Sequence, residues 1–224
     1  MATAKTKKQI NSSTLQFPVV GIGASAGGLE ALKQFLKALP ANTGMAFVFI
    51  QHLNPNHVSI LPEILERLSP IPVQHVTDQV HIEPDHLYIV PENKVVTTTD
   101  GVLQLEPRSK DHKKNDLIDQ FFSSLGVVHQ SYAVGIVLSG ALNDGTVGLQ
   151  VIKSYGGLTF AQDSNSAAFE SMPGSAVKAG VIDFVLTPAK IAERLVEINK
   201  PFQPDAGVKS EEQVFKQILR TFSK

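Results

Sequence analysis

The chain has 224 residues, a length that one α/β domain can fill, and it contains no cysteine. The lack of cysteine excludes disulfides, thiolate catalysis and cysteine-ligated zinc or iron–sulfur centres. Twenty basic residues against twenty-one acidic ones leave a formal charge of −1, so the composition offers no broad basic surface for nucleic acid or for an acidic membrane.

The first segment, residues 1–16, predicts a flexible N-terminal arm. It contains lysines but lacks the apolar stretch that a secretory signal needs. No apolar run in the chain approaches the ~18 residues that span a bilayer, so we predict no membrane insertion. We expect a soluble protein of the cytoplasm.

Apolar runs typical of buried strands then alternate with helical patterns, which favours an α/β domain with a doubly wound, mostly parallel sheet. FPVVGIG (17–23) predicts the first strand, and leucines at helical spacing predict a helix that ends before Pro40. MAFVFI (45–50) predicts a central parallel strand. A short helix is expected over about 59–68, with Ser59 as its cap.

The middle of the chain predicts an added antiparallel β-hairpin near 87–105. HLYIV, NKVVTTT and VLQL are strand-like, and the last two are joined by Asp100-Gly101, a strong hairpin signal. The charged stretch that follows predicts an exposed loop.

The second half returns to alternating helices and strands. A helix is expected over about 116–128, a central strand at AVGIVLSG (133–140), and a helix at TVGLQVIKS. LTFA and DFVL predict further strands, and Thr187-Pro188 begins the last helix of the domain as a cap followed by proline. We place this domain at 17–199.

Residues 200–224 predict a linker and a C-terminal amphipathic helix. Ser210 and Gln213 form a capping box ahead of an apolar stripe. This helix would dock on the domain or meet a partner.

The segment GIGASAGG fits two motifs with different functions. Gly21, Gly23 and Ala26 match G-x-G-x-x-A, the loop that holds a dinucleotide pyrophosphate. Gly23, Ser25 and Gly27 match G-x-S-x-G, the turn that presents a nucleophilic serine. Both motifs need a strand before the loop and a helix after it, and both find them here.

The residues downstream favour the serine. A nicotinamide-dinucleotide site usually has an acid about twenty residues further on, yet no acidic residue lies between Glu30 and Glu63, and the first arginine is Arg67. We therefore expect no bound cofactor, with dinucleotide binding kept as the less favoured alternative. The second strand ends instead in Gln51-His52.

The first strand is expected to end at Ser25 and the second at His52, and the strand AVGIVLSG leads to Asp144. The carboxyl ends of parallel strands share one edge of a sheet, so we expect these three residues on the same edge. In this arrangement Ser25 attacks, His52 takes its proton, and Asp144 fixes the imidazole tautomer. Each residue also has an ordinary structural explanation: a helix cap for Ser25, a core position for His52 and a turn for Asp144.

The histidines do not predict a metal site. His52 and His57 are five residues apart with no acid near them, which is not the spacing of helical ligands. His81 and His86 flank Pro84 in a turn region.

Four ordered stretches carry a resemblance to a known family: VGIGASAGGLEAL, VFIQHLNPNH, IVLSGALNDGTVGL and GLTFAQDSNSAAFESMPGSAVKAGVIDFVL. Together, over about 17–198, they resemble the catalytic domain of CheB-type chemotaxis protein-glutamate methylesterases. The resemblance implies a doubly wound α/β fold with an added hairpin. It also implies that the family's nucleophile, base and acid fall on Ser25, His52 and Asp144.

The implied reaction is hydrolysis of glutamyl methyl esters on the cytoplasmic helices of chemoreceptors, with release of methanol and without a cofactor. Deamidation of particular glutamines is implied as well. The expected oxyanion donors are the backbone N–H groups of Ala26 or Gly27, with Ala141 as a further candidate. The expected partners are methylated chemoreceptor cytoplasmic domains and signalling proteins.

The chain departs from the family at several positions. Ala26 stands where threonine is common, Gly140-Ala141-Leu142 replaces Gly-Met-Gly, and 115–119 replaces R-P-S-V-D except for its last residue. About sixteen residues precede the first strand, too few for the usual receiver domain, so we expect a catalytic domain without one. A non-catalytic module that binds receptors or kinases is the alternative.

Overall fold

The computed structural model describes residues 14–52, 61–92, 94–108 and 116–199. Within them, a seven-stranded sheet runs in the order β10-β9-β8-β1-β2-β5-β3, and every pairing in it is parallel. Its strands are β1 (Val19–Ala24), β2 (Ala46–Gln51), β3 (Val73–His75), β5 (Leu87–Ile89), β8 (Ala133–Val137), β9 (Leu158–Gln162) and β10 (Phe184–Leu186). The predicted doubly wound α/β sheet is confirmed.

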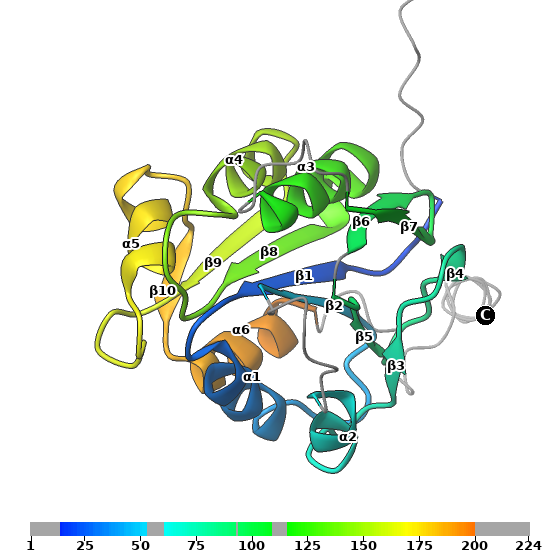
Figure 1. Ribbon diagram of the computed structural model, residues 1–224, viewed down its shortest axis with the longest axis horizontal. Helices are drawn as coiled ribbons and strands as arrows, with labels where there is room; N and C mark the ends of the chain where they lie inside the picture. The colour runs from blue at the N-terminus through cyan, green and yellow to red at the C-terminus, as the bar shows by residue number, and fades with distance from the viewer. Residues whose placement is uncertain (1–13, 53–60, 93, 109–115, 200–224) are drawn as a thin grey trace, which may run out of the picture.

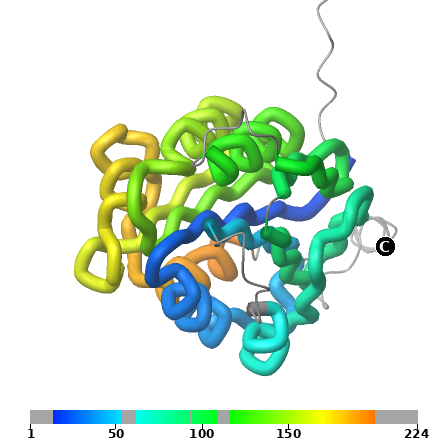
Figure 2. The backbone as a smooth tube through the Cα atoms, in the orientation of Figure 1, coloured from blue at the N-terminus to red at the C-terminus, as the bar shows by residue number. Residues whose placement is uncertain are grey.

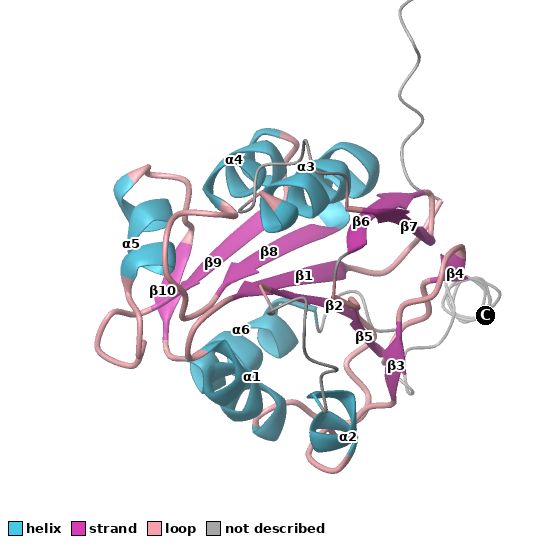
Figure 3. Ribbon diagram, in the orientation of Figure 1, coloured by secondary structure: helices cyan, strands magenta, loops and turns pink. Residues whose placement is uncertain are grey.

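Helices cover both faces of this sheet (Figures 1 and 3). One face carries α3 (Leu117–His129), which ends in a 3₁₀ turn (Gln130–Tyr132), and α4 (Thr146–Ser154). The other face carries α1 (Gly28–Lys37) and α6 (Pro188–Asn199). The helix α2 (Leu61–Glu66) lies near β3, and α5 (Ser171–Lys178) contacts β9 and α4. Because both faces are covered, the central strands are continuous apolar runs, as parallel sheets require.

Alternate residues of β1 face opposite helix layers. Val20 and Ile22 belong to the core under α1 and α6. Gly21 and Gly23 lie on the side of α3, where a Cβ atom on Gly23 would come within 2.5 Å of Ile118 Cγ2. Gly21 and Gly23 of the GIGASAGG segment therefore let α3 approach the centre of the sheet closely.

A second sheet is antiparallel, with the order β4-β7-β6. Strands β6 (Lys94–Thr99) and β7 (Val102–Pro107) form the predicted hairpin, and Gly101 supplies the positive φ of its turn at 73°. β4 (Val80–His81) extends the sheet beside β7, and α3 packs on β6.

The predicted extent of the hairpin region was wrong at its start. Leu87–Ile89 is β5, a parallel strand between β2 and β3, because three consecutive buried side chains suit the interior of the main sheet. The sequence patterns did not predict β3, β4 or α5. Ser59, the predicted cap of the short helix over about 59–68, and the predicted C-terminal helix lie outside the described residues.

The order in which strands are added to the sheet reverses beside β1 (Figure 2). From β1 the sheet grows through β2 and β5 to one edge, and from β8 through β9 and β10 to the other. The carboxyl ends of β1 and β8 thus flank the switch point of the sheet, where ligands of such folds bind. None of the helices in the described ranges is long and apolar enough to cross a membrane.

One buried histidine of the α3 layer makes the fold sensitive to acid. His129 is buried, and its Nε2 lies 3.1 Å from Thr98 Oγ1, while its Nδ1 has no hydrogen-bond partner in the described structure. Burial lowers the pKa of His129 to about 4, against a smaller opposite effect of the Asp100 charge.

We predict that acid weakens the fold through His129. Between the ordinary histidine pKa of about 6.5 and the folded value, the unfolded chain binds the additional proton, so stability is lost as pH falls. From about pH 7.5 to about pH 5, this one group should remove about 2 kcal/mol from the free energy of unfolding.

Urea unfolding at both pH values measures the loss. His129→Gln keeps a group that can bond to Thr98 but does not titrate, so its loss over the same range should be smaller by about that amount. Equal losses in the two proteins would contradict the assignment.

Candidate active site

Ser25 occupies the first position after β1, in the turn that leads to α1. The turn is closed by Gly28 N–H, which donates to Ser25 O at 3.0 Å. The cap of α1 is Gly27, in the left-handed region with φ 74°, and no side chain caps the helix. The cap role considered for Ser25 is therefore wrong, and its hydroxyl is not used to start α1.

Small residues let three segments meet at this turn. A Cβ atom on Gly28 would lie 2.4 Å from Ala24 Cβ, and one on Gly27 would lie 2.7 Å from Ser139 Oγ. A Cβ atom on Gly140 would lie 3.0 Å from Ser25 Cβ. The loop after β8 thus passes directly beside the Ser25 side chain.

Ser139 fixes the backbone of the Ser25 turn. Its carbonyl accepts from Ser25 N at 3.0 Å, and its hydroxyl donates to Ala26 O at 2.8 Å. Its own N–H donates to Gln162 Oε1 at 2.8 Å. Ser139 and Gln162 were not predicted as site residues, although both stand at strand ends on the same edge as the predicted ones.

His52 and Asp144 are brought together as predicted. His52 Nε2 lies 2.8 Å from Asp144 Oδ2, and the Asp144 side chain is fully buried. Since a carboxylate only accepts, Nε2 carries the hydrogen of this bond and Nδ1 is left as the basic nitrogen. The backbone N–H of His52 also donates to Ala24 O at 3.3 Å, which connects the histidine to the end of β1.

The carboxylate of Asp144 is saturated with donors. Besides His52, its oxygens accept from the N–H groups of Ile118 at 3.0 Å, Asp119 at 2.9 Å and Gly145 at 2.8 Å. Two of these N–H groups belong to the first turn of α3, whose own cap residue makes no side-chain bond to the helix. Asp144 therefore serves α3 as its N-cap from a distant part of the chain.

Asp119 caps the start of α4 in a similar way. Its Oδ1 accepts from Gly148 N at 2.8 Å, in the first turn of α4. Burial, together with the nearby charge of Asp144, raises the pKa of Asp119 to about 6 despite the bond from Gly148. The two aspartates thus cross-link the starts of two neighbouring helices under the His52 side chain.

Ser25 directly follows Ala24, the residue whose carbonyl accepts from the backbone N–H of His52. No hydrogen bond joins Ser25 Oγ to His52 within the described residues, a common state of such pairs without substrate. The N–H groups of the oxyanion candidates Ala26, Gly27 and Ala141 likewise have no acceptor in the described part of the chain. Within the described residues, the fold therefore does not use these three N–H groups.

The described residues contain no group of three histidine or acidic side chains placed to hold a metal ion. His81 lies in β4 and His86 Nδ1 pairs with Pro84 O at 2.9 Å, whereas His57 lies outside the described residues.

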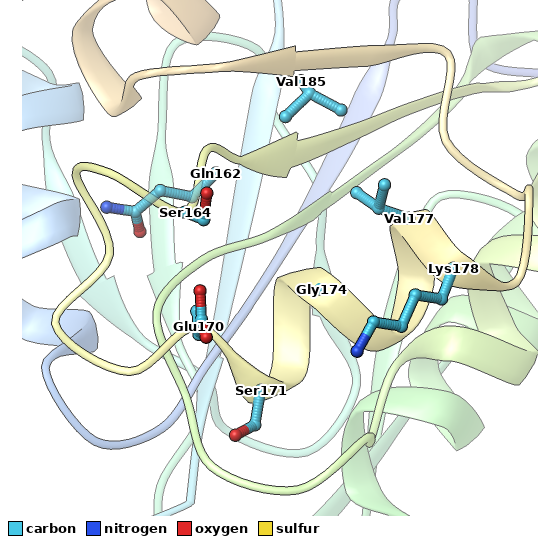
Figure 4. A pocket seen from close by; sticks show the side chains of 8 residues that line it. All are labelled: Gln162, Ser164, Glu170, Ser171, Gly174, Val177, Lys178 and Val185. Atoms are coloured by element: carbon cyan, nitrogen blue, oxygen red, sulfur yellow. The ribbon is translucent and has the colours of Figure 1, made fainter.

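A cavity of about 410 Å³ opens next to the site, between α5 and the ends of β9 and β10 (Figure 4). Gln162, which accepts from Ser139 N–H behind the Ser25 turn, also lines this cavity. Its lining is Gln162, Ser164, Glu170, Ser171, Gly174, Val177, Lys178 and Val185.

The fold and the site together define an α/β domain that carries serine, histidine and aspartate at the switch point of a parallel sheet. The chain belongs to the CheB methylesterase family, whose model matches residues 20–195.

Relatives and one solved structure support this membership. A Leptospira interrogans protein, provisionally named protein-glutamate methylesterase/protein-glutamine glutaminase, is 30% identical over 187 residues, which cover 83% of this chain and 97% of that protein. A Trichodesmium erythraeum protein of the same name is 30% identical over 88% of this chain and 57% of its own length. The crystal structure of the Thermotoga maritima CheB methylesterase catalytic domain superposes with a TM-score of 0.75 at 27% identity, over 82% of this chain and 100% of that one.

We predict that Asp144→Asn destabilises the fold as well as changing the site. The amide would place an NH₂ group against N–H donors and would remove the charge from the start of α3. A loss of about 2–4 kcal/mol in the free energy of unfolding is expected.

Chemical denaturation measures this loss, with Ser25→Ala as the matched control. The Ser25 hydroxyl makes no hydrogen bond within the described structure, so the control should stay within about 0.5 kcal/mol of the wild type. If Asp144→Asn were as stable as Ser25→Ala, the capping role of Asp144 would be refuted.

Proposed function

We propose that this protein is a serine esterase that hydrolyses glutamyl methyl esters on the cytoplasmic helices of chemoreceptors and releases methanol. The observation that carries the proposal is the hydrogen bond between the partly exposed His52 and the buried Asp144, which leaves the second imidazole nitrogen basic at the edge where Ser25 follows β1. The membership of the CheB methylesterase family supplies the substrate class. Glutamine deamidation at the same site is part of the proposal, because relatives carry the name glutaminase.

In the first step, Ser25 Oγ attacks the ester carbonyl while His52 Nδ1 takes the hydroxyl proton. Asp144 accepts from Nε2–H throughout, holds the ring in this tautomer and stabilises the imidazolium that forms. Four donors on Asp144 keep its carboxylate in place, so the histidine meets a fixed negative charge.

The tetrahedral intermediate places a negative charge on the former carbonyl oxygen. The N–H groups of Ala26 and Gly27, at the start of α1, and that of Ala141, after β8, are the proposed donors. A well-placed donor of this kind contributes about 3 kcal/mol to transition-state stabilisation.

The imidazolium then gives its proton to the departing methoxide oxygen, and methanol leaves an acyl-enzyme on Ser25. Water attacks this ester with His52 as base, and the products are a glutamate carboxylate and free Ser25. With glutamine as substrate, the same proton goes to nitrogen and ammonia leaves.

Chemoreceptor cytoplasmic domains are accordingly the proposed substrates and partners, together with signalling proteins that regulate the reaction. The proposed location is therefore the cytoplasm. The alternatives, a non-catalytic module that binds receptors or kinases and a dinucleotide-binding protein, predict no methanol release.

We predict that the wild type releases methanol from a methylated chemoreceptor cytoplasmic fragment, followed by gas chromatography. Ser25→Ala should lower the rate by about 10³-fold or more, because the nucleophile is lost while the fold remains. His129→Gln is the matched control, since it changes a buried residue at the far end of α3 and should keep the rate within about twofold.

Binding of the fragment without methanol release by the wild type would overturn the esterase proposal and favour the binding module. Saturable binding of NADH that is lost in Gly23→Val would favour the dinucleotide alternative instead.

A further inference from the structure

Leu142 has a backbone conformation that leucine rarely adopts. Its φ is 70°, in the left-handed region, where the Cβ atom of an L-residue is crowded. The other non-glycine residues with positive φ in the described ranges are polar: Gln79, Asp85 and Gln130. Leu142 has no polar side-chain atom that could bond to its own backbone in compensation, so its conformation is costly.

The backbone on both sides of Leu142 explains how this conformation is held. Gly140 N–H donates to Phe169 O at 3.0 Å, and Gly140 O accepts from Met172 N at 3.0 Å. Two residues after Leu142, the Asp144 carboxylate is fixed by its four donors. The segment between these anchors is short, so they dictate its path.

Packing of the leucine side chain inside the domain does not offset this strain. Leu142 is 52% exposed, and it lies two residues from Gly140, whose Cβ position faces Ser25. Two more large apolar side chains are exposed on adjoining segments: Phe169, 50% exposed, and Val147 in the first turn of α4. Phe169 Cδ2 would lie 3.4 Å from a Cβ atom on Gly27, next to the Ser25 turn.

We propose that Leu142, with Phe169 beside the Ser25 turn, is a specificity-determining residue that contacts an apolar side chain of the substrate close to the esterified glutamate. The inference rests on the proposed esterase function and adds to it a preference among polypeptide esters. The apolar contact is made with the substrate rather than with the fold, which is consistent with an exposed leucine in a strained conformation at the edge of the site. On a helical substrate the contacted side chain stands three or four residues from the ester, since those positions share a face.

The test uses two synthetic helical peptides, each with one glutamate γ-methyl ester. One has leucine three and four residues from the ester on both sides, and the other has serine at these positions. Methanol release gives kcat/KM for each peptide, and hydrolysis of p-nitrophenyl acetate reports on the chemistry without the apolar contact. The variants are Leu142→Gly, Leu142→Asn and Leu142→Met. Gln79→Gly, directly before β4 of the second sheet, is the control for removing a positive-φ side chain outside the site.

The wild type should prefer the leucine peptide by about tenfold, and Leu142→Gly and Leu142→Asn should reduce this preference to about twofold or less. Leu142→Met and Gln79→Gly should keep it, and all variants should hydrolyse p-nitrophenyl acetate within about threefold of the wild type. The thermal midpoint of Leu142→Gly should be equal to or above that of the wild type, because glycine tolerates positive φ.

An unchanged preference in Leu142→Gly overturns the inference while leaving the esterase proposal intact. A parallel loss of p-nitrophenyl acetate hydrolysis overturns it too, because Leu142 would then act through the geometry of Ala141 or Asp144. A lower midpoint in Leu142→Gly would overturn it as well, because the leucine would then stabilise the fold. No methanol from either peptide with the wild type contradicts the proposed function itself, and the inference falls with it.

Discussion

The Asp144 carboxylate is the interaction on which the rest of the site depends. It is buried and accepts four hydrogen bonds, one from His52 and two from the first turn of α3. A buried carboxylate is tolerable only when its oxygens are satisfied, and here the helix supplies both the donors and a favourable dipole. The orientation of the histidine and the position of α3 therefore depend on the same carboxylate.

That arrangement explains the glycines that resemble a dinucleotide loop. Gly23 leaves room for Ile118, and this close approach lets the start of α3 reach Asp144. Gly27 and Gly28 let α1 begin directly after the serine, against Ser139 and Ala24. The G-x-G-x-x-A pattern thus reflects the packing of α3 and the tight turn at Ser25. In a dinucleotide site such small residues leave room for a pyrophosphate. In this protein they leave room for neighbouring segments of the chain.

Much of the fold could be predicted from the sequence because strong local patterns coincide with the elements. Continuous apolar runs identified β1, β2 and β8, and Thr187-Pro188 identified the start of α6. Strand ends identified His52 and Asp144 as neighbours. Leu87–Ile89 was misassigned because pairing between distant strands, rather than local preference, decides which sheet it joins. The links through Ser139, Gln162 and Asp119 depend on distances between loops, which no sequence pattern encodes.

The proposed chemistry requires above all that Ser25 is a nucleophile activated by His52. The direct measurement is covalent labelling with a fluorophosphonate, followed by intact mass and peptide mapping, because it needs no knowledge of the substrate. We predict one adduct, located on Ser25, whose rate of formation falls about 10³-fold in His52→Gln. The absence of an adduct, an adduct on another residue, or an equal rate in His52→Gln would contradict it.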